Sequence, residues 1–115
     1  MNNTTSITLY NLKKHSLNEI YAGKHWMKRK RIKDSYKILI KNQFKHTFSK
    51  SKIYEVSYEF VFQANPLDAS NTVYMLKMIE DILFESDGYK IVSNLNIKSR
   101  KGKMDCVNIV VTEIN

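Results

Sequence analysis

Residues 53–84 read IYEVSYEFVFQANPLDASNTVYMLKMIEDILF, and this stretch decides the fold. From residue 53 to residue 63, apolar and polar side chains alternate, which is the period of a half-buried β-strand. The core-facing side of this strand is aromatic: Tyr54, Tyr58, Phe60 and Phe62. Asn65-Pro66 should end the strand, because proline has no amide hydrogen to donate to a sheet. Over about residues 71–84 the apolar side chains recur with helical spacing instead, with Asp68 or Ser70 as the expected N-cap.

The flanking segments extend this strand–helix unit in both directions. A short strand is expected over residues 6–10, a polar loop over 11–23 and a helix over about 27–44. Residues 89–99 and 107–114 are interpreted as the strands of a β-hairpin that turns at Lys101-Gly102-Lys103. The predicted order is β-α-β-α-β-β. It indicates one α/β (α+β) domain over residues 1–115, with two helices packed on a mixed β-sheet.

Composition excludes several classes of protein. The chain has 115 residues and a single cysteine, so it holds neither an intramolecular disulfide nor a multi-cysteine zinc site. It has no run of about 18 apolar residues that would span a membrane. The first ten residues lack the basic and apolar parts of a secretory signal. We therefore expect a cytoplasmic protein without a membrane partner.

Positive charge is concentrated in the first half of the chain. The net charge is +8, and residues 1–52 hold 13 Lys and Arg against two acidic residues, whereas residues 53–115 hold six against nine. On the helix expected over 27–44, apolar residues and cations each recur every four positions and so occupy separate faces. We expect the cationic face to bind nucleic-acid phosphates, with a merely solvated face as the alternative. The cations that recur on this face are Arg29, Lys33, Lys37, Lys41 and Lys45. The residues of the helix expected to bind DNA are Lys28, Arg29, Arg31, Lys33, Lys37 and Lys41. The expected turn adds Arg100, Lys101 and Lys103, for which a solvated turn is the alternative.

Several short motifs, taken in their order along the chain, resemble one family of nucleases. They are Ser6-Ile7-Thr8-Leu9, Ser16-x-Asn18-x-x-Tyr21 with the basic helix after it, Leu67-Asp68-Ala69-Ser70-Asn71, Lys77-Met78-Ile79-Glu80-Asp81, Asp87 before a strand, and Ser99-Arg100-Lys101-Gly102-Lys103. This succession is similar to the RusA-type Holliday-junction resolvases, above all to their bacteriophage-borne relatives. The resemblance implies a homodimeric endonuclease of the bacterial cytoplasm that uses Mg²⁺, with Mn²⁺ as the other candidate ion. It implies that the protein resolves four-way junctions of branched DNA in recombination and repair.

The essential residues of that family are three aspartates and a lysine. Its opening Asp-x-Asp-Asn pattern reads Asp68-Ala69-Ser70-Asn71 here, so Ser70 stands where a second aspartate is expected. The third aspartate carries over to Asp87 and the lysine to Lys77. The resemblance thus implies four catalytic residues, Asp68, Asp87, Lys77 and Asp81. The implied metal ligands are Asp68, Asp87 and Glu80, and either Glu80 or Asp81 would take the role of the missing aspartate.

Plainer interpretations of these residues stay open. Asp68 could cap the second helix, Asp87 could be a turn residue, and Lys77 could pair with Asp81 on an exposed side of the helix. A helix of 14 residues rises about 21 Å. Asp68 and Asp87 would therefore share an ion only if the next strand folds back, the helix begins later or a second subunit completes the site. Because Ser70 is a poor metal ligand, a module that binds branched nucleic acid without cutting it is the alternative function, and an RNA-directed protein is a third.

Three other features bear on function. The pair His25-Trp26 could stack on an exposed base, or Trp26 could be an anchor of the core. Cys106 is expected as a small buried hydrophobic residue. The histidines show no metal-ligand spacing.

Overall fold

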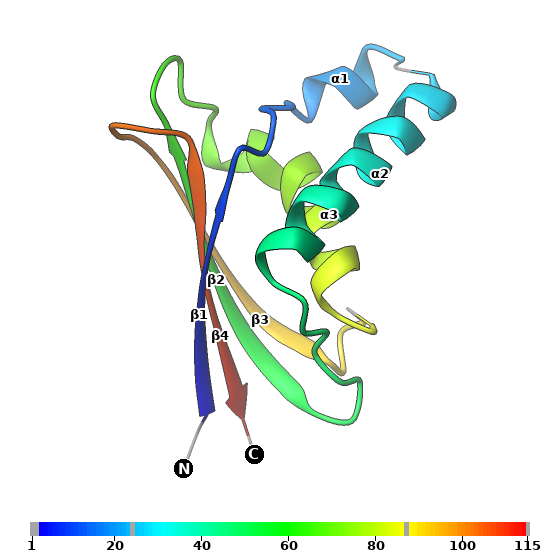
Figure 1. Ribbon diagram of the computed structural model, residues 1–115, viewed down its shortest axis with the longest axis vertical. Helices are drawn as coiled ribbons and strands as arrows, with labels where there is room; N and C mark the ends of the chain where they lie inside the picture. The colour runs from blue at the N-terminus through cyan, green and yellow to red at the C-terminus, as the bar shows by residue number, and fades with distance from the viewer. Residues whose placement is uncertain (1–2, 24, 87, 115) are drawn as a thin grey trace.

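Four strands form one mixed sheet in the order β1-β4-β2-β3. The computed structural model of the protein describes residues 3–23, 25–86 and 88–114. The strands are β1 (Asn3–Tyr10), β2 (Ile53–Phe62), β3 (Val92–Lys101) and β4 (Cys106–Ile114), and the helices are α1 (Asn18–Tyr21), α2 (Trp26–Gln43), η1 (Ala69–Thr72) and α3 (Val73–Leu83). β2 and β3 are parallel, whereas β4 is antiparallel to both β1 and β2 (Figure 1). The predicted α+β fold with a mixed sheet is confirmed.

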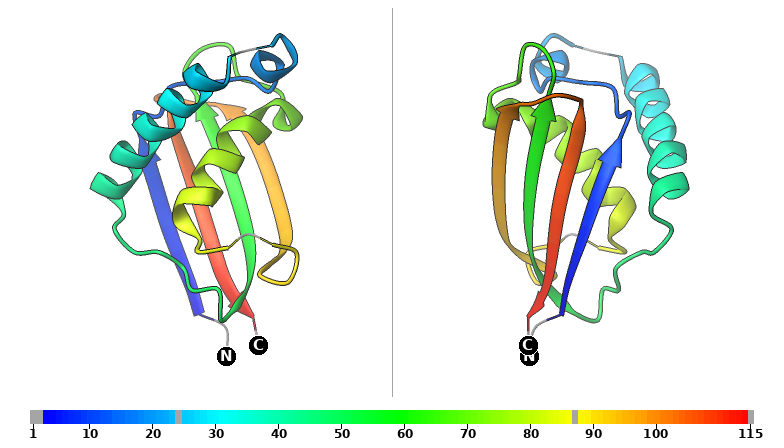
Figure 2. Two further views of the ribbon diagram at one scale, coloured as in Figure 1. Left: turned by 90° about the vertical axis from the view of Figure 1, so that its right-hand side faces the viewer. Right: turned by 60° about the vertical axis from the view of Figure 1, so that its left-hand side comes forward.

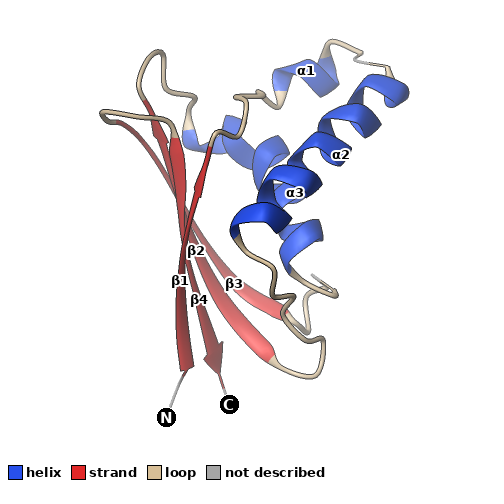
Figure 3. Cartoon of the chain, in the orientation of Figure 1, coloured by secondary structure: helices blue, strands red, loops and turns tan. Residues whose placement is uncertain are grey.

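α2 and α3 lie on the same face of the sheet (Figures 2 and 3). α3 is the more deeply packed helix, since eight of its eleven residues are buried. The aromatic side of β2 faces the helices as predicted, and its Tyr58 and Phe60 are almost completely buried. The other face of the sheet is left uncovered by α2 and α3. The strands therefore present their polar sides, such as Ser57 and Glu59 of β2, to solvent on that face.

The predicted hairpin of the last two strands is wrong, because β3 and β4 do not pair with each other. They lie on opposite sides of β2, and residues 102–105 cross over its end. Gly102 permits this crossing: a Cβ atom there would collide with the side chain of Val61, and its amide donates to the carbonyl of Phe62 at 2.9 Å. Asp105 then accepts a hydrogen bond from the amide of Gln63 at 2.7 Å. Strands on either side of a third lie about 10 Å apart, which four residues can span.

The helices differ from the prediction in number and in one start. α2 agrees with the expected helix to within one residue at each end. The expected second helix is divided into two parts, the 3-10 turn η1 and the α-helix α3. The α-helix begins at residue 73 rather than at 71. The segment 11–23, predicted to be loop, contains α1, whose four residues are too few for hydrophobic periodicity to detect. None of the described helices is long and apolar enough to cross a membrane.

Candidate nucleic-acid interface and carboxylate positions

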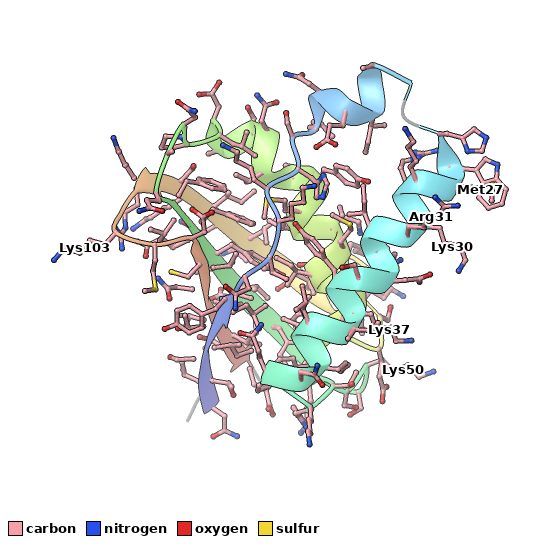
Figure 4. All side chains as sticks on the ribbon, turned by 45° about the horizontal axis from the view of Figure 1, so that its top comes forward. Met27, Lys30, Arg31, Lys37, Lys50 and Lys103 are labelled. Carbon is pink, nitrogen blue, oxygen red and sulfur yellow. The ribbon has the colours of Figure 1, made fainter. Side chains whose placement is uncertain are left out.

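The solvent side of α2 is densely cationic. Lys28, Arg29, Arg31 and Lys37 are exposed, and in the described part of the chain none of them forms an ion pair. Lys30, which is also exposed, pairs with Asp34 one turn further along at 3.0 Å. Figure 4 shows Lys30 and Lys37 on the side of the helix away from the sheet, whereas Arg31 lines a hollow with Lys13 and Ser35. These cations are therefore exposed and mostly uncompensated, but they lie around α2 rather than on one face, since Lys28 and Lys37 are about 180° apart on the helix.

Lys41, near the C-terminal end of α2, forms hydrogen bonds with the loop that follows the helix. Its ammonium donates to the hydroxyl of Thr47 at 2.8 Å and to the carbonyl of His46 at 3.4 Å. Burial lowers the pKa of Lys41 below its ordinary value, and the nearby charge of Lys37 lowers it further. Lys41 is thus less available to a phosphate than the exposed cations earlier in the helix.

Three predicted functional residues meet where α2 passes α3. Lys33 of α2 lies 3.1 Å from Asp81 Oδ2, and Lys77 of α3 lies 3.6 Å from Asp81 Oδ1. The alternative interpretation of Lys77 and Asp81 as an ion pair on α3 is confirmed, with Lys33 added across the helix interface. Two ammonium groups thus lie beside the carboxylate of Asp81, and such surroundings oppose the binding of a further cation at Asp81.

Glu80, an implied metal ligand, lies in the core of the protein. It is 5% exposed, and the hydroxyl of Tyr58 on β2 donates to its Oε1 at 3.2 Å. Glu80 shares a helix face with Leu76, four residues before it, and Leu83, three after it, and that face packs on the sheet. A buried carboxylate needs hydrogen bonds, a paired cation or a metal ion to offset its loss of hydration, and the Tyr58 hydroxyl supplies one such hydrogen bond. Its predicted role as a magnesium ligand stays a prediction, and its observed contact is with the core.

Asp68 lies at the end of the sheet where the parallel strands β2 and β3 terminate. The hydroxyl of Ser99, near the end of β3, donates to the carbonyl of Leu67, the residue before Asp68. Asp68 occupies the N-cap position of η1, but its exposed side chain makes no capping hydrogen bond. On the other side, the amide of Leu17 donates to the carbonyl of Asn71 at 3.0 Å. The loop motif around Ser16 and the motif around Asp68 are therefore neighbours in space.

The predicted carboxylates do not come together in the described residues of one chain. Glu80 and Asp81 lie in the last turn of α3, which rises about 16 Å from its start near Asp68. Asp87 lies outside the described residues. The amide of Ile91, just before β3, donates to the carbonyl of Gly88 at 2.8 Å, and Ile91 lies about 26 Å along the strand from Ser99. In the described ranges, no three His, Cys, Asp or Glu residues form a group that could hold a metal ion.

The cations of the β3–β4 connection form a second, separate site. Arg100 lies 3.3 Å from Glu59 on the uncovered face of the sheet, and Asn108 donates to the same carboxylate at 2.9 Å. The hydrogen bond from Asn108, and then that from Arg100, lower the pKa of Glu59. Lys101 and Lys103 are exposed, and Figure 4 shows Lys103 on the opposite side of the molecule from the labelled cations of α2.

Three further side-chain features were either missed or left undecided by the sequence analysis. Buried His15 lies 3.1 Å from both carboxylate oxygens of Glu19, which also accepts from the amide of Ser16 at 2.7 Å. The spacing of four residues between His15 and Glu19 was the available signal. Trp26 is 61% exposed, so its interpretation as a core anchor is wrong. Cys106 is half-buried, and its partial burial raises the pKa of its thiol.

A scan against models of protein families finds no match to this chain, and no curated protein matches its sequence. Function must therefore be inferred from the side chains and their geometry. They provide an exposed cationic helix, a carboxylate with two lysines beside it, and one exposed aspartate at the end of the parallel strands.

Proposed function

We propose that the protein is a structure-specific endonuclease of the RusA type, which binds branched DNA through α2 and hydrolyses a phosphodiester with the help of Mg²⁺ at Asp68. The observation that carries the proposal is the uncompensated positive charge of the exposed cations distributed around an 18-residue helix. A helix of this length extends over about 27 Å. It is long enough to contact phosphates of more than one DNA arm where the arms converge.

Binding through this helix is expected to read shape and charge rather than base sequence. Lysine and arginine contacts to phosphates position a protein on DNA but do not distinguish one base pair from another. The cluster of Lys33, Lys77 and Asp81 extends the positive surface from α2 onto α3. A four-way junction brings more phosphates near one such surface than a linear duplex does. The expected preference for branched DNA follows from that density of negative charge.

The catalytic part of the proposal rests on Asp68 and on the resemblance to the RusA-type enzymes. Magnesium takes oxygen ligands, keeps several waters and is often held by one or two carboxylates together with a substrate phosphate. When bound, it would polarise the scissile phosphate and supply a hydroxide. Asp68 fits the role of one ligand, since its side chain is exposed and not used as a helix cap. In the described residues of one chain, Asp68 belongs to no group of three or more His, Cys, Asp or Glu residues that could hold a metal ion. A homodimer that completes the ligand set is therefore part of the proposal.

A binding module without nuclease activity is the second candidate. Ser70, where the family pattern has an aspartate, favours this module, as does the separation of Asp68 from Glu80 and Asp81 by the length of α3. On this hypothesis the same cations of α2 bind branched nucleic acid, and Asp68 has no catalytic role.

One experiment distinguishes the two candidates. The purified chain is incubated with a labelled four-way junction, with and without Mg²⁺ or Mn²⁺, and the products and the bound fraction are measured. The matched variants are Asp68→Asn and Glu55→Gln, each of which removes one exposed carboxylate; Glu55 lies on β2. Metal-dependent cleavage that is lost only in Asp68→Asn, with binding retained, supports the nuclease.

The other outcomes contradict the proposal in different ways. Tight junction binding by folded protein without a metal-dependent product supports the binding module. Cleavage that Asp68→Asn leaves intact removes Asp68 from the mechanism. Competition by double-stranded RNA that exceeds competition by junction DNA contradicts the proposed DNA substrate.

A further inference from the structure

The N-terminal end of α2 presents an indole ring to solvent. Trp26 is 61% exposed and Met27 is 46% exposed, although tryptophan is among the side chains that gain most from burial. Four consecutive cations follow them: Lys28, Arg29, Lys30 and Arg31. Isolated exposed apolar residues are common on protein surfaces. Trp26 differs from such isolated residues because its ring stacks on a neighbouring histidine.

The exposed ring is held in a defined position. His25 is the N-cap of α2, and its Nδ1 accepts a hydrogen bond from the amide of Met27 at 3.2 Å. This bond orients the imidazole, against which the indole of Trp26 stacks with a centroid separation of 5.8 Å and an interplanar angle of 29°. Stacking on His25 still leaves most of Trp26 accessible. The helix end therefore carries a preorganised aromatic platform.

The platform is in line with the cations of the helix. Because successive residues are about 100° apart, Trp26, Lys30, Lys33 and Lys37 fall within about 60° of one another around α2. Lys30 lies about 6 Å along the axis from Trp26. Lys30 and Lys33 also pair with Asp34 and Asp81, whereas Lys37 has no ion pair in the described residues. A nucleic-acid strand whose phosphates follow this row of lysines would bring a base to the indole.

We propose that Trp26, backed by His25, stacks on an unpaired base of the nucleic acid that α2 binds. This inference rests on the proposed function and deepens it, because it names the feature that is recognised: an unstacked base at a branch point or in a single strand. Aromatic stacking on a base is independent of sequence, since every base offers a π-face. A fully paired duplex keeps its bases stacked on each other and makes no such contact.

The pattern around the platform favours a nucleic acid over a lipid surface. The other strongly exposed apolar residue of α2, Ile38, lies on the same side as Met27. Arg31 and Asp34 stand between them on that side. A helix that lies in a membrane interface needs a continuous apolar face, and this side is interrupted by charges of both signs.

Trp26 is the single tryptophan of the chain, so intrinsic fluorescence reports on this contact directly. The wild-type protein is titrated at low salt with a four-way junction, a single-stranded oligonucleotide, a fully paired duplex and inorganic polyphosphate. Polyphosphate supplies negative charge without bases. Indole quenching and protection from acrylamide are expected with the junction and the single strand. Polyphosphate should displace labelled junction from the protein and leave the emission unchanged.

Affinity measurements on variants test the same inference independently. Trp26→Ala should weaken binding to the junction and the single strand about 5- to 100-fold, which is the range for loss of one base stack, and should leave duplex affinity unchanged. Trp26→Phe keeps an aromatic ring and should restore most of the affinity. Ile38→Ala removes an equally exposed apolar side chain of α2 and should change neither value.

The possible failures can be told apart. Equal quenching by polyphosphate, or equal weakening of junction and duplex by Trp26→Ala, would overturn the stacking inference while leaving nucleic-acid binding intact. A blue shift on phosphatidylserine-containing vesicles without a base-dependent response would overturn it in favour of a lipid surface. If no nucleic acid binds even at low salt, the proposed function itself fails.

Discussion

Removing two of the uncompensated cations of α2 should halve the salt dependence of DNA binding. The exposed side chains without an ion pair in the described residues are Lys28, Arg29, Arg31 and Lys37. If each neutralises one phosphate, the slope of log affinity against log salt is about −3.6 for the wild type. Between 50 and 200 mM salt, affinity should then fall about 150-fold. The double variant Arg31→Gln/Lys37→Gln should show a slope of about −1.8 and a fall of about 12-fold.

Fluorescence anisotropy of a labelled four-way junction, titrated over this salt range, measures both slopes. The matched control is Lys90→Gln/Lys98→Gln, which removes two exposed lysines outside α2; Lys98 lies on β3. Its slope should equal that of the wild type. An unchanged slope in the α2 variant, or a reduced slope only in the control, would refute the assignment of the interface to α2. Circular dichroism of each variant confirms that the fold is retained.

Three further predictions concern the fold that carries this surface. Tyr58→Phe should lower the free energy of unfolding by about 1–2 kcal/mol in urea, because the buried carboxylate of α3 loses a donor, whereas Tyr89→Phe, at an exposed position, should not. Glu59 has a lowered pKa in the folded state, so its contribution to stability is present above the unfolded carboxyl pKa of about 4.3 and is lost as pH falls through the folded pKa. The difference in unfolding free energy between wild type and Glu59→Gln should therefore shrink over that acidic range. An undiminished difference would contradict the stabilising role of the Glu59 carboxylate. Gly102→Ala should lower the thermal midpoint through a clash worth about 1–3 kcal/mol, while Gly88→Ala, which meets only an ordinary contact, should be nearly neutral.

Local periodicity predicted most of the secondary structure. The alternation in residues 53–63 identified β2 and its buried aromatic side, and the four-residue spacing in 27–44 identified α2 with its apolar face. Both signals depend on neighbours within two to four positions, which is the distance over which backbone geometry repeats. α1 escaped detection because one turn of helix is too short to show a period.

The candidate site could be predicted only in part. The pairing of Lys77 with Asp81 follows from helical spacing, and the structure bears it out. The cations of α2 are exposed, but they lie around the helix rather than on one face. The burial of Glu80 required knowing that its side of α3 faces the sheet, although its spacing from Leu76 and Leu83 was a usable signal. The exposure of Trp26 had no local signal at all, because an aromatic residue at a helix start fits a core as readily as a surface.

Repeating patterns of side chains in the sequence thus determined the strands and the helices. They did not determine the order of the strands in the sheet, because four strands of similar character can pair in several ways. A short connection such as residues 102–105 suits a hairpin as well as a crossing over β2. Contacts between residues far apart in the chain chose among them. The same contacts separated Asp68 from the carboxylates of α3 and set Lys33 beside Asp81. Such contacts depend on how apolar faces pack together in three dimensions, a property that no short window of sequence contains.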